Sequence, residues 1–221
     1  MGNIIKKLGA FSIGPIAAAF LGFLTVPLIT YFITPEEYGK ASMFTLAQGI
    51  ASMLVYFGLD QAFVREFHVY KDKLNALLSN AIFVPLFFVS VLGIIIIINA
   101  NWMSRILFDS SNEKIAVYML SIMLPFMVIE NFAFLTIRMN EKGLQYSLST
   151  ISLKVLVLII TVLLFFVYER SFRSVVYAMA IAEIVNGIIL FFAVIYPQKI
   201  SLYYLDKDLI KGMLRFGLPL V

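Results

Sequence analysis

The chain of 221 residues has no cysteine and only one histidine, and these absences limit its chemistry. Without cysteine there is neither a disulfide framework nor a thiolate metal site. With His68 as the only histidine, zinc chemistry is not expected. A membrane enzyme would need a large polar loop or a cluster of histidine and carboxylates, and the loops are too short. The sequence therefore predicts no enzyme, no catalytic or metal site and no cofactor.

Charged residues are also scarce, at 14% of the chain, whereas hydrophobic residues make up 62%. A soluble protein has about a quarter charged residues and is nearer half apolar. The net charge of +4 does not indicate nucleic acid binding, because the basic residues are scattered through short loops. The apolar residues come in blocks long enough to cross a bilayer, which takes about 20 residues of helix.

Six such apolar blocks can be recognised along the chain. They do not alternate in period two, as the strands of a membrane barrel would, so we expect helices. The blocks cover residues 8–33, 38–64, 77–100, 115–137, 146–168 and 174–196. The sequence therefore predicts an all-α membrane protein whose residues 1–208 form one lobe of six transmembrane helices.

Basic residues are distributed unequally between the two sides of these spans, eleven against five. The richer side has Lys6, Lys7, Arg65, Lys71, Lys73, Arg138, Lys142, Lys199, Lys207, Lys211 and Arg215, and the other has Lys40, Arg105, Lys114, Arg170 and Arg173. Cytoplasmic loops carry the excess of lysine and arginine. We therefore expect the amino terminus and the segment after the sixth span to be cytoplasmic.

The segment Thr34-Pro35-Glu36-Glu37 predicts the start of the second span. It places a hydroxyl at the N-cap, proline at the first helical position and a carboxylate at the third, which together form a capping box. For Glu36 and Glu37 this structural role is preferred to a role in substrate binding.

Four ionisable side chains lie inside the predicted spans, where insertion of each costs about 2.5 to 3.5 kcal/mol. They are Asp60, Glu130, Lys154 and Glu183. Glu130 and Lys154 lie equally far from the loop between the fourth and fifth spans, so both are expected about 12 Å deep. Two roles remain open for them: an ion pair that holds two helices in register, or a charge site in a transport cavity.

Lys154 is also expected within reach of Glu183, which has Asn186 one turn away. An exchange between the two carboxylates would leave one of them to bind a cation or a proton. Arg65 lies at the cytoplasmic rim, where a long basic side chain can reach the headgroups.

The second span carries a polar stripe on one helix face, made of Ser42, Thr45, Gln48, Ser52, Tyr56 and Asp60. Such a stripe indicates either tight helix packing or the lining of a cavity, and the larger side chains favour a cavity. The candidate residues of a substrate or ion pathway are therefore Gln48, Tyr56, Asp60, Arg65, Glu130, Lys154, Glu183 and Asn186.

The last residues, 209–221, repeat the character of the first span: a basic lead-in is followed by glycine, proline and apolar residues. This pattern predicts the start of a seventh span and a second lobe beyond it.

Three segments carry a resemblance to a known family. They are residues 34–39 (TPEEYG), 57–66 (FGLDQAFVRE) and 216–219 (FGLP). Together with the spacing of the spans, they resemble the Wzx-type oligosaccharide-lipid flippases, polysaccharide biosynthesis proteins of a superfamily that also holds the multidrug and toxic compound extrusion transporters and the lipid II flippases. The chain is similar to the amino-terminal half of such a protein.

The resemblance implies two six-helix lobes that face each other across a cavity and alternate between inward-open and outward-open states. It implies movement of a polyprenyl-diphosphate-linked oligosaccharide from the cytoplasmic to the outer leaflet of a bacterial inner membrane, for O-antigen-like polysaccharide. Partners would be the lipid-linked oligosaccharide, membrane lipids, a coupling proton or sodium ion, and polysaccharide polymerase machinery. Cationic cavity residues would contact phosphate, and Lys154 is the only basic residue well inside a span.

A multidrug or metabolite extruder of the same superfamily, driven by a proton or sodium gradient, is the alternative. An acidic ion-coupling residue in the first span would favour it, and residues 8–33 contain none.

Overall fold

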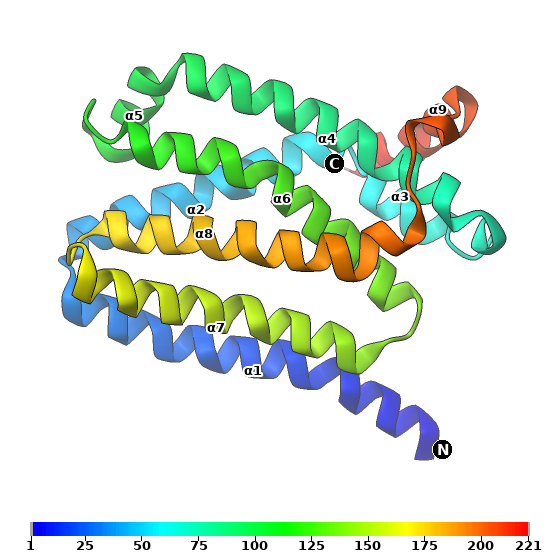
Figure 1. Ribbon diagram of the computed structural model, residues 1–221, viewed down its shortest axis with the longest axis horizontal. Helices are drawn as coiled ribbons and strands as arrows, with labels where there is room; N and C mark the ends of the chain where they lie inside the picture. Colours follow the sequence, from blue (N-terminus) through cyan, green and yellow to red (C-terminus); the bar gives the residue numbers. More distant parts are fainter. Residues whose placement is uncertain (1, 221) are drawn as a thin grey trace.

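The computed structural model describes the backbone of residues 2–220 and the side chains of residues 9–219 (Figure 1). This part of the chain is helical and contains no strand. Five helices are long and apolar enough to cross a membrane: α1 (Gly2–Phe32), α4 (Leu74–Ile98), α6 (Lys114–Met139), α7 (Gly143–Val167) and α8 (Phe172–Leu190). The expected all-α membrane fold is confirmed.

Two further helices, α2 (Pro35–Tyr56) and α3 (Leu59–Glu66), are together long and apolar enough to cross a membrane, and they are bent by 54° relative to each other. The expectation of one uninterrupted helix over residues 38–64 is wrong on this point. Phe57 and Gly58 between the helices both have positive φ, 49° and 69°, which no α-helix accommodates.

The capping box at the start of α2 is confirmed. The backbone N–H of Glu37 donates to Thr34 Oγ1 over 3.3 Å, and the backbone N–H of Thr34 donates to Glu37 Oε2 over 3.2 Å. Glu36 forms an ion pair with Lys40 one turn further on, at 3.0 Å. The acidic residues of this segment therefore stabilise the first turn of α2.

Two shorter helices complete the fold. The loop after α4 contains α5 (Ala100–Phe108), and α9 (Lys207–Gly217) follows the span that begins with α8. The end of that span is irregular, since α8 continues as a π-helical segment (Phe191–Ile195) and a 3₁₀ turn (Tyr196–Gln198). That residues 209–221 open a seventh span stays a prediction.

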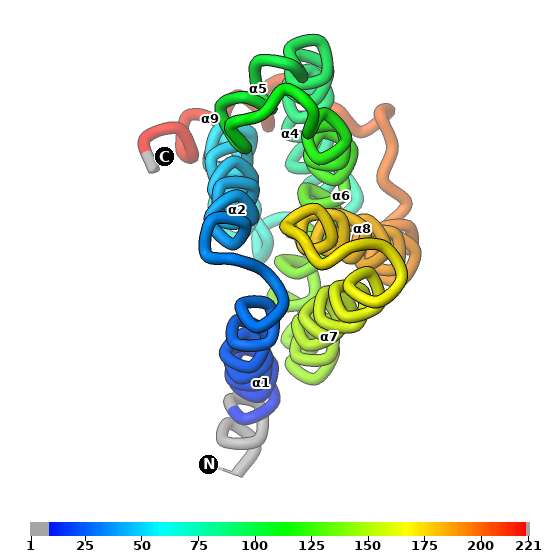
Figure 2. The backbone as a smooth tube through the Cα atoms, turned by 90° about the vertical axis from the view of Figure 1, so that its left-hand side faces the viewer, coloured from blue at the N-terminus to red at the C-terminus, as the bar shows by residue number. Residues whose placement is uncertain are grey.

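The helices follow one another in space in an order that differs from their order in the chain. α1 packs chiefly on α7, α8 lies between α7 and α6, and α4 covers the opposite side of α6. Figure 2 shows α1 and α7 at one edge of the molecule and α4 and α5 at the other. α2 packs on both α6 and α8. The helices that are neighbours in sequence, α6 and α7, therefore share only a small contact.

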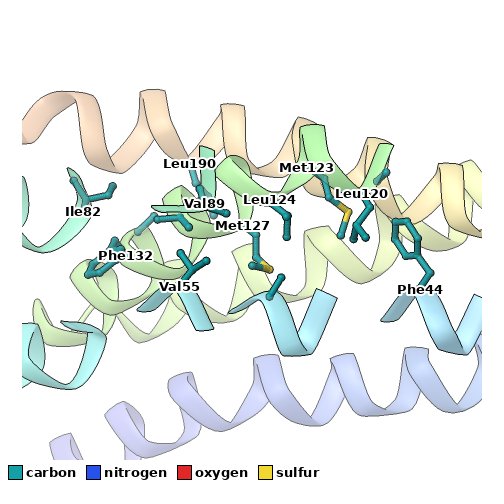
Figure 3. Packing of buried hydrophobic residues seen from close by; sticks show 14 of the residues in the cluster. Phe44, Val55, Ile82, Val89, Leu120, Met123, Leu124, Met127, Phe132 and Leu190 are labelled. Carbon is teal, nitrogen blue, oxygen red and sulfur yellow. The ribbon is translucent and has the colours of Figure 1, made fainter. Parts of the chain in front are cut away.

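The core lies between α2, α4, α6 and α8 (Figure 3). Phe44 and Phe132 are fully buried there, and Val55 and Leu190 nearly so. Lipid tails are as apolar as these side chains, so close packing is what holds the helices together in a bilayer.

α1 is fastened to α7 by a hydroxyl. The backbone N–H of Gly14 donates to Ser147 Oγ over 2.8 Å, and that hydroxyl donates to the carbonyl of Ala10 over 2.5 Å. The two backbone groups are four residues apart, the pair that an undisturbed α-helix joins directly. Because a Cβ on Gly14 would lie 2.5 Å from the Cα of Ser147, only glycine permits this approach.

Candidate functional site

A chain of hydrogen bonds crosses three helices near the middle of the lobe. Asn186 Nδ2, on α8, donates to Glu130 Oε2, on α6, over 2.8 Å. Asn186 Oδ1 accepts from the hydroxyl of Ser152, on α7, over 3.1 Å. Glu130 is 5% exposed and Asn186 is 1% exposed. The carboxylate is thus held by an uncharged donor in the interior of the helix bundle.

Glu183 and Lys154 complete the charged part of this cluster. Glu183, one turn before Asn186 on α8, is 8% exposed, whereas Lys154 on α7 is exposed. Lys154 interacts electrostatically with Glu130 and with Glu183. Within the described side chains, however, no ion pair of 4 Å or less joins Lys154 to either carboxylate.

The ion pair between Glu130 and Lys154, one of the two roles left open for them, is therefore not formed in this structure. The reason is the lateral order of the helices, because α8 packs between α6 and α7 and brings Asn186 to Glu130 instead. The structure thus does not support the interpretation that an ion pair between Glu130 and Lys154 holds two adjacent helices in register.

Tyr56 and Asp60 reach the same cluster from the two sides of the break in the second span. Tyr56 Oη donates to the carbonyl of Met127 over 3.4 Å, and the Tyr56 ring meets that of Phe132 edge to face. Tyr56 interacts electrostatically with Glu183, Asp60 and Glu130. The Asp60 carboxylate accepts from Gln61 Nε2 over 3.0 Å.

The polar stripe of α2 does not pack tightly within this lobe. A Cβ on Gly49 would meet no atom within 4 Å, and Ser42 and Thr45 are exposed and bond back to their own helix. Gln48 is half-buried, with Nε2 3.7 Å from the sulfur of Met127. The side chains of this stripe are therefore partly exposed on the surface of the lobe.

Arg65 lies apart from the cluster. It is exposed at the end of α3, where its Nε is 3.5 Å from Glu66 Oε1 and its guanidinium lies 4.4 Å from the centre of the Phe216 ring. Of the eight candidates, the structure brings Tyr56, Asp60, Glu130, Lys154, Glu183 and Asn186 together, places Gln48 further along α2, and leaves Arg65 at the helix end.

Two polar features escaped the sequence analysis. Asn131, next to Glu130, has a buried Nδ2 with no hydrogen-bond partner among the described residues. A survey of all polar side chains inside the spans, and not only of ionisable ones, would have found it. At the other end of the bundle, Arg173 makes two 2.6 Å contacts with Glu113 and a longer one with Glu169.

The cluster can bind charged groups and can take up or release a proton or an ion. It offers two buried carboxylates, one exposed ammonium, amides and a phenol. The described residues contain no group of three or more histidine, cysteine, aspartate or glutamate side chains that could hold a metal ion.

Comparison with known proteins identifies the family of the chain and a similar fold. The model of the family described as "Polysaccharide biosynthesis protein" matches residues 4–221. No curated protein sequence matches the chain. The fold is similar to that of a solved MOP superfamily transporter from Pyrococcus furiosus, at a TM-score of 0.70 and 16% identity. The similarity covers 97% of this chain and 51% of the archaeal one, so the chain spans about half of that transporter. The archaeal protein is described as having a binding pocket of reverse polarity that suggests a different function.

Proposed function

Because the chain belongs to the polysaccharide biosynthesis protein family, we propose that it forms one lobe of a flippase for a polyprenyl-diphosphate-linked oligosaccharide. The flippase moves this lipid from the cytoplasmic to the outer leaflet of a bacterial inner membrane, for cell-envelope polysaccharide. A second lobe closes the other side of the cavity, and polysaccharide polymerase machinery takes up the product.

The observation that carries the proposal is the position of Lys154. It lies inside a span, yet its side chain is exposed on the surface of the lobe. An ammonium that faced lipid at this depth would be costly, so we infer that it faces a water-filled cavity. There it offers a charged donor to the diphosphate, which binds charged donors strongly.

The buried carboxylates suit the coupling of transport to an ion gradient. Glu130 and Glu183 are buried, and among the described side chains neither forms a direct ion pair. A proton or a sodium ion on one of them would compensate for the burial of its charge. When the diphosphate draws Lys154 away, the carboxylates lose their nearest cation and take up the coupling ion.

A drug or metabolite extruder is the second candidate, and the excess of acidic residues favours it. Three carboxylates, of Asp60, Glu130 and Glu183, accompany one lysine in the cluster, a balance that suits a cationic cargo. In that case Lys154 partly compensates the negative charge of the carboxylates until the cationic cargo binds. The two candidates differ in what replacement of Lys154 does: it abolishes transport of a diphosphate but leaves or improves transport of a cation.

The test is complementation of a strain that lacks its own oligosaccharide-lipid flippase, using the complete transporter. Lys154→Arg should retain polysaccharide export and Lys154→Met should lose it, at equal protein levels in the membrane. Arg105→Met is the matched control, because Arg105 is an exposed basic residue on α5, away from the cluster. Export by Lys154→Met at the normal level would rule out the proposed contact with the diphosphate. Resistance to cationic drugs without any export would favour the second candidate.

A further inference from the structure

Two identical tripeptides, Phe57-Gly58-Leu59 and Phe216-Gly217-Leu218, meet in the structure although about 160 residues separate them. The first forms the break between α2 and α3, and the second ends α9. A Cβ on Gly58 would lie 2.2 Å from the carbonyl oxygen of Gly217, and a Cβ on Gly217 would lie 2.6 Å from the carbonyl carbon and oxygen of Gly58. Contacts this short leave room for no side chain, so only glycine fits at both positions.

The start of α9 is also fixed. Asn80 of α4, which is fully buried, donates from Nδ2 to the carbonyl of Tyr204 over 2.8 Å. Its Oδ1 accepts from the backbone N–H of Asp206 over 2.8 Å. Asp206 in turn caps α9 by accepting from the N–H groups of Asp208 and Leu209.

α9 is therefore held at both ends, by α4 at its start and by the break in the second span at its end. The guanidinium of Arg65 over the Phe216 ring adds to the contact between α3 and α9, and Met213 of α9 is buried. Figure 1 shows α3 and α9 at the same end of the bundle.

We propose that Gly217 is a positioning residue, whose contact with Gly58 holds the break in the second span open and so sets Tyr56 relative to Asp60. Tyr56 is the last residue of α2 and Asp60 lies in the first turn of α3. A change at the contact between Gly217 and Gly58 therefore alters the angle between α2 and α3, which carry Tyr56 and Asp60. The proposal rests on the proposed function only in assigning Tyr56 and Asp60 to the transport pathway.

These 221 residues contain no cysteine, so introduced cysteines are the only spin-label sites within them. Spin labels at Leu46→Cys and Gln61→Cys, both exposed positions, span the break, and an unbroken helix would place them about 22 Å apart. The distance between the labels is measured by double electron–electron resonance in the complete transporter, with Gly217→Ala or Gly212→Ala added. Gly212 is the matched control, because it lies on the same helix and a Cβ there meets no atom within 4 Å.

Gly217→Ala should shift the distance distribution, and Gly212→Ala should leave it unchanged. In the unlabelled protein, Gly217→Ala should lower transport on the order of tenfold or more, since a small misplacement of pathway groups is costly. An unchanged distance in Gly217→Ala overturns the inference, whatever transport does. A shifted distance with normal transport supports the positioning role and argues against Tyr56 and Asp60 as pathway residues.

Where Gly217→Ala gives no folded protein, Phe216→Leu serves in its place. It removes the ring beneath Arg65 without adding an atom at the glycine contact. A smaller shift in the same distance supports the inference, and no shift overturns it.

Discussion

Asn186 on α8 and Glu130 on α6 are joined by a hydrogen bond of 2.8 Å in the buried centre of the lobe. The amide provides the only direct hydrogen bond from a described residue to this carboxylate. Asn186 also joins Glu130 to Ser152 of α7, so one side chain ties three spans together.

Replacement of Asn186 by leucine should therefore destabilise the fold. It leaves a buried carboxylate without its donor, at a cost of about 1 to 3 kcal/mol. The thermal unfolding midpoint of the purified protein measures this. Asn112→Leu, at an exposed position outside the spans, is the control and should leave the midpoint unchanged. Equal midpoints for the two variants would show that the hydrogen bond contributes nothing to stability.

Lys154 should matter for transport and not for folding. It is exposed and forms no direct ion pair within the described residues, so Lys154→Met should change the free energy of unfolding by no more than about 0.5 kcal/mol. In a double-mutant cycle with Glu130→Gln, the coupling energy should be about 0.5 to 1 kcal/mol, because Lys154 acts on this carboxylate without a direct ion pair. A larger coupling, or a strong loss of folded protein in Lys154→Met, would restore the interpretation as a buried ion pair.

The ion pair between Arg173 and Glu113 should stabilise the opposite end of the bundle. Glu113 is 7% exposed as a residue, and both its carboxylate oxygens contact Arg173 at 2.6 Å. Glu113→Gln should lower the free energy of unfolding by about 1 to 3 kcal/mol, between the values for exposed and for buried pairs. The exchange Glu113→Arg with Arg173→Glu should recover part of the loss. No recovery would indicate that the geometry, and not the pairing of charges, is what stabilises this end.

The orientation in the membrane is predicted from the basic residues and can be tested directly. A reporter that is active only outside the cytoplasm should be active when fused at Asn112 and inactive when fused at Asp206. The opposite pattern would reverse the assignment of the two sides. Lys6 and Lys7, which contribute to the prediction, lie outside the residues whose side chains the structure describes.

The features that depend on neighbours in sequence could be predicted from the sequence. The capping box of Thr34 and Glu37 is an example, because both partners lie within one helical turn. The helices that are long and apolar enough to cross a membrane could also be predicted, because the test depends on length and composition alone. The break at Phe57 and Gly58 could not be predicted, because the groups that pack against it come from residue 217.

Six of the eight candidate residues lie together in the structure, but their contacts could not be predicted. The depth of Glu130 and Lys154 follows from counting residues along each helix. Which helix lies beside which is a property of packing, and here α8 separates the two. That Asn131 Nδ2 has no hydrogen-bond partner among the described residues could not be predicted either, because it depends on which helices pack around Asn131.

The central claim, that the protein moves a lipid-linked oligosaccharide, is tested most directly in proteoliposomes that contain the complete transporter. A polyprenyl-diphosphate-linked oligosaccharide is placed in both leaflets, an ion gradient is applied, and a glycosidase is added outside. We expect the transporter to make the inner-leaflet pool accessible to the enzyme, and Lys154→Met to leave it protected. The account would be contradicted if the inner-leaflet pool stayed protected in vesicles in which the same protein moves a cationic drug.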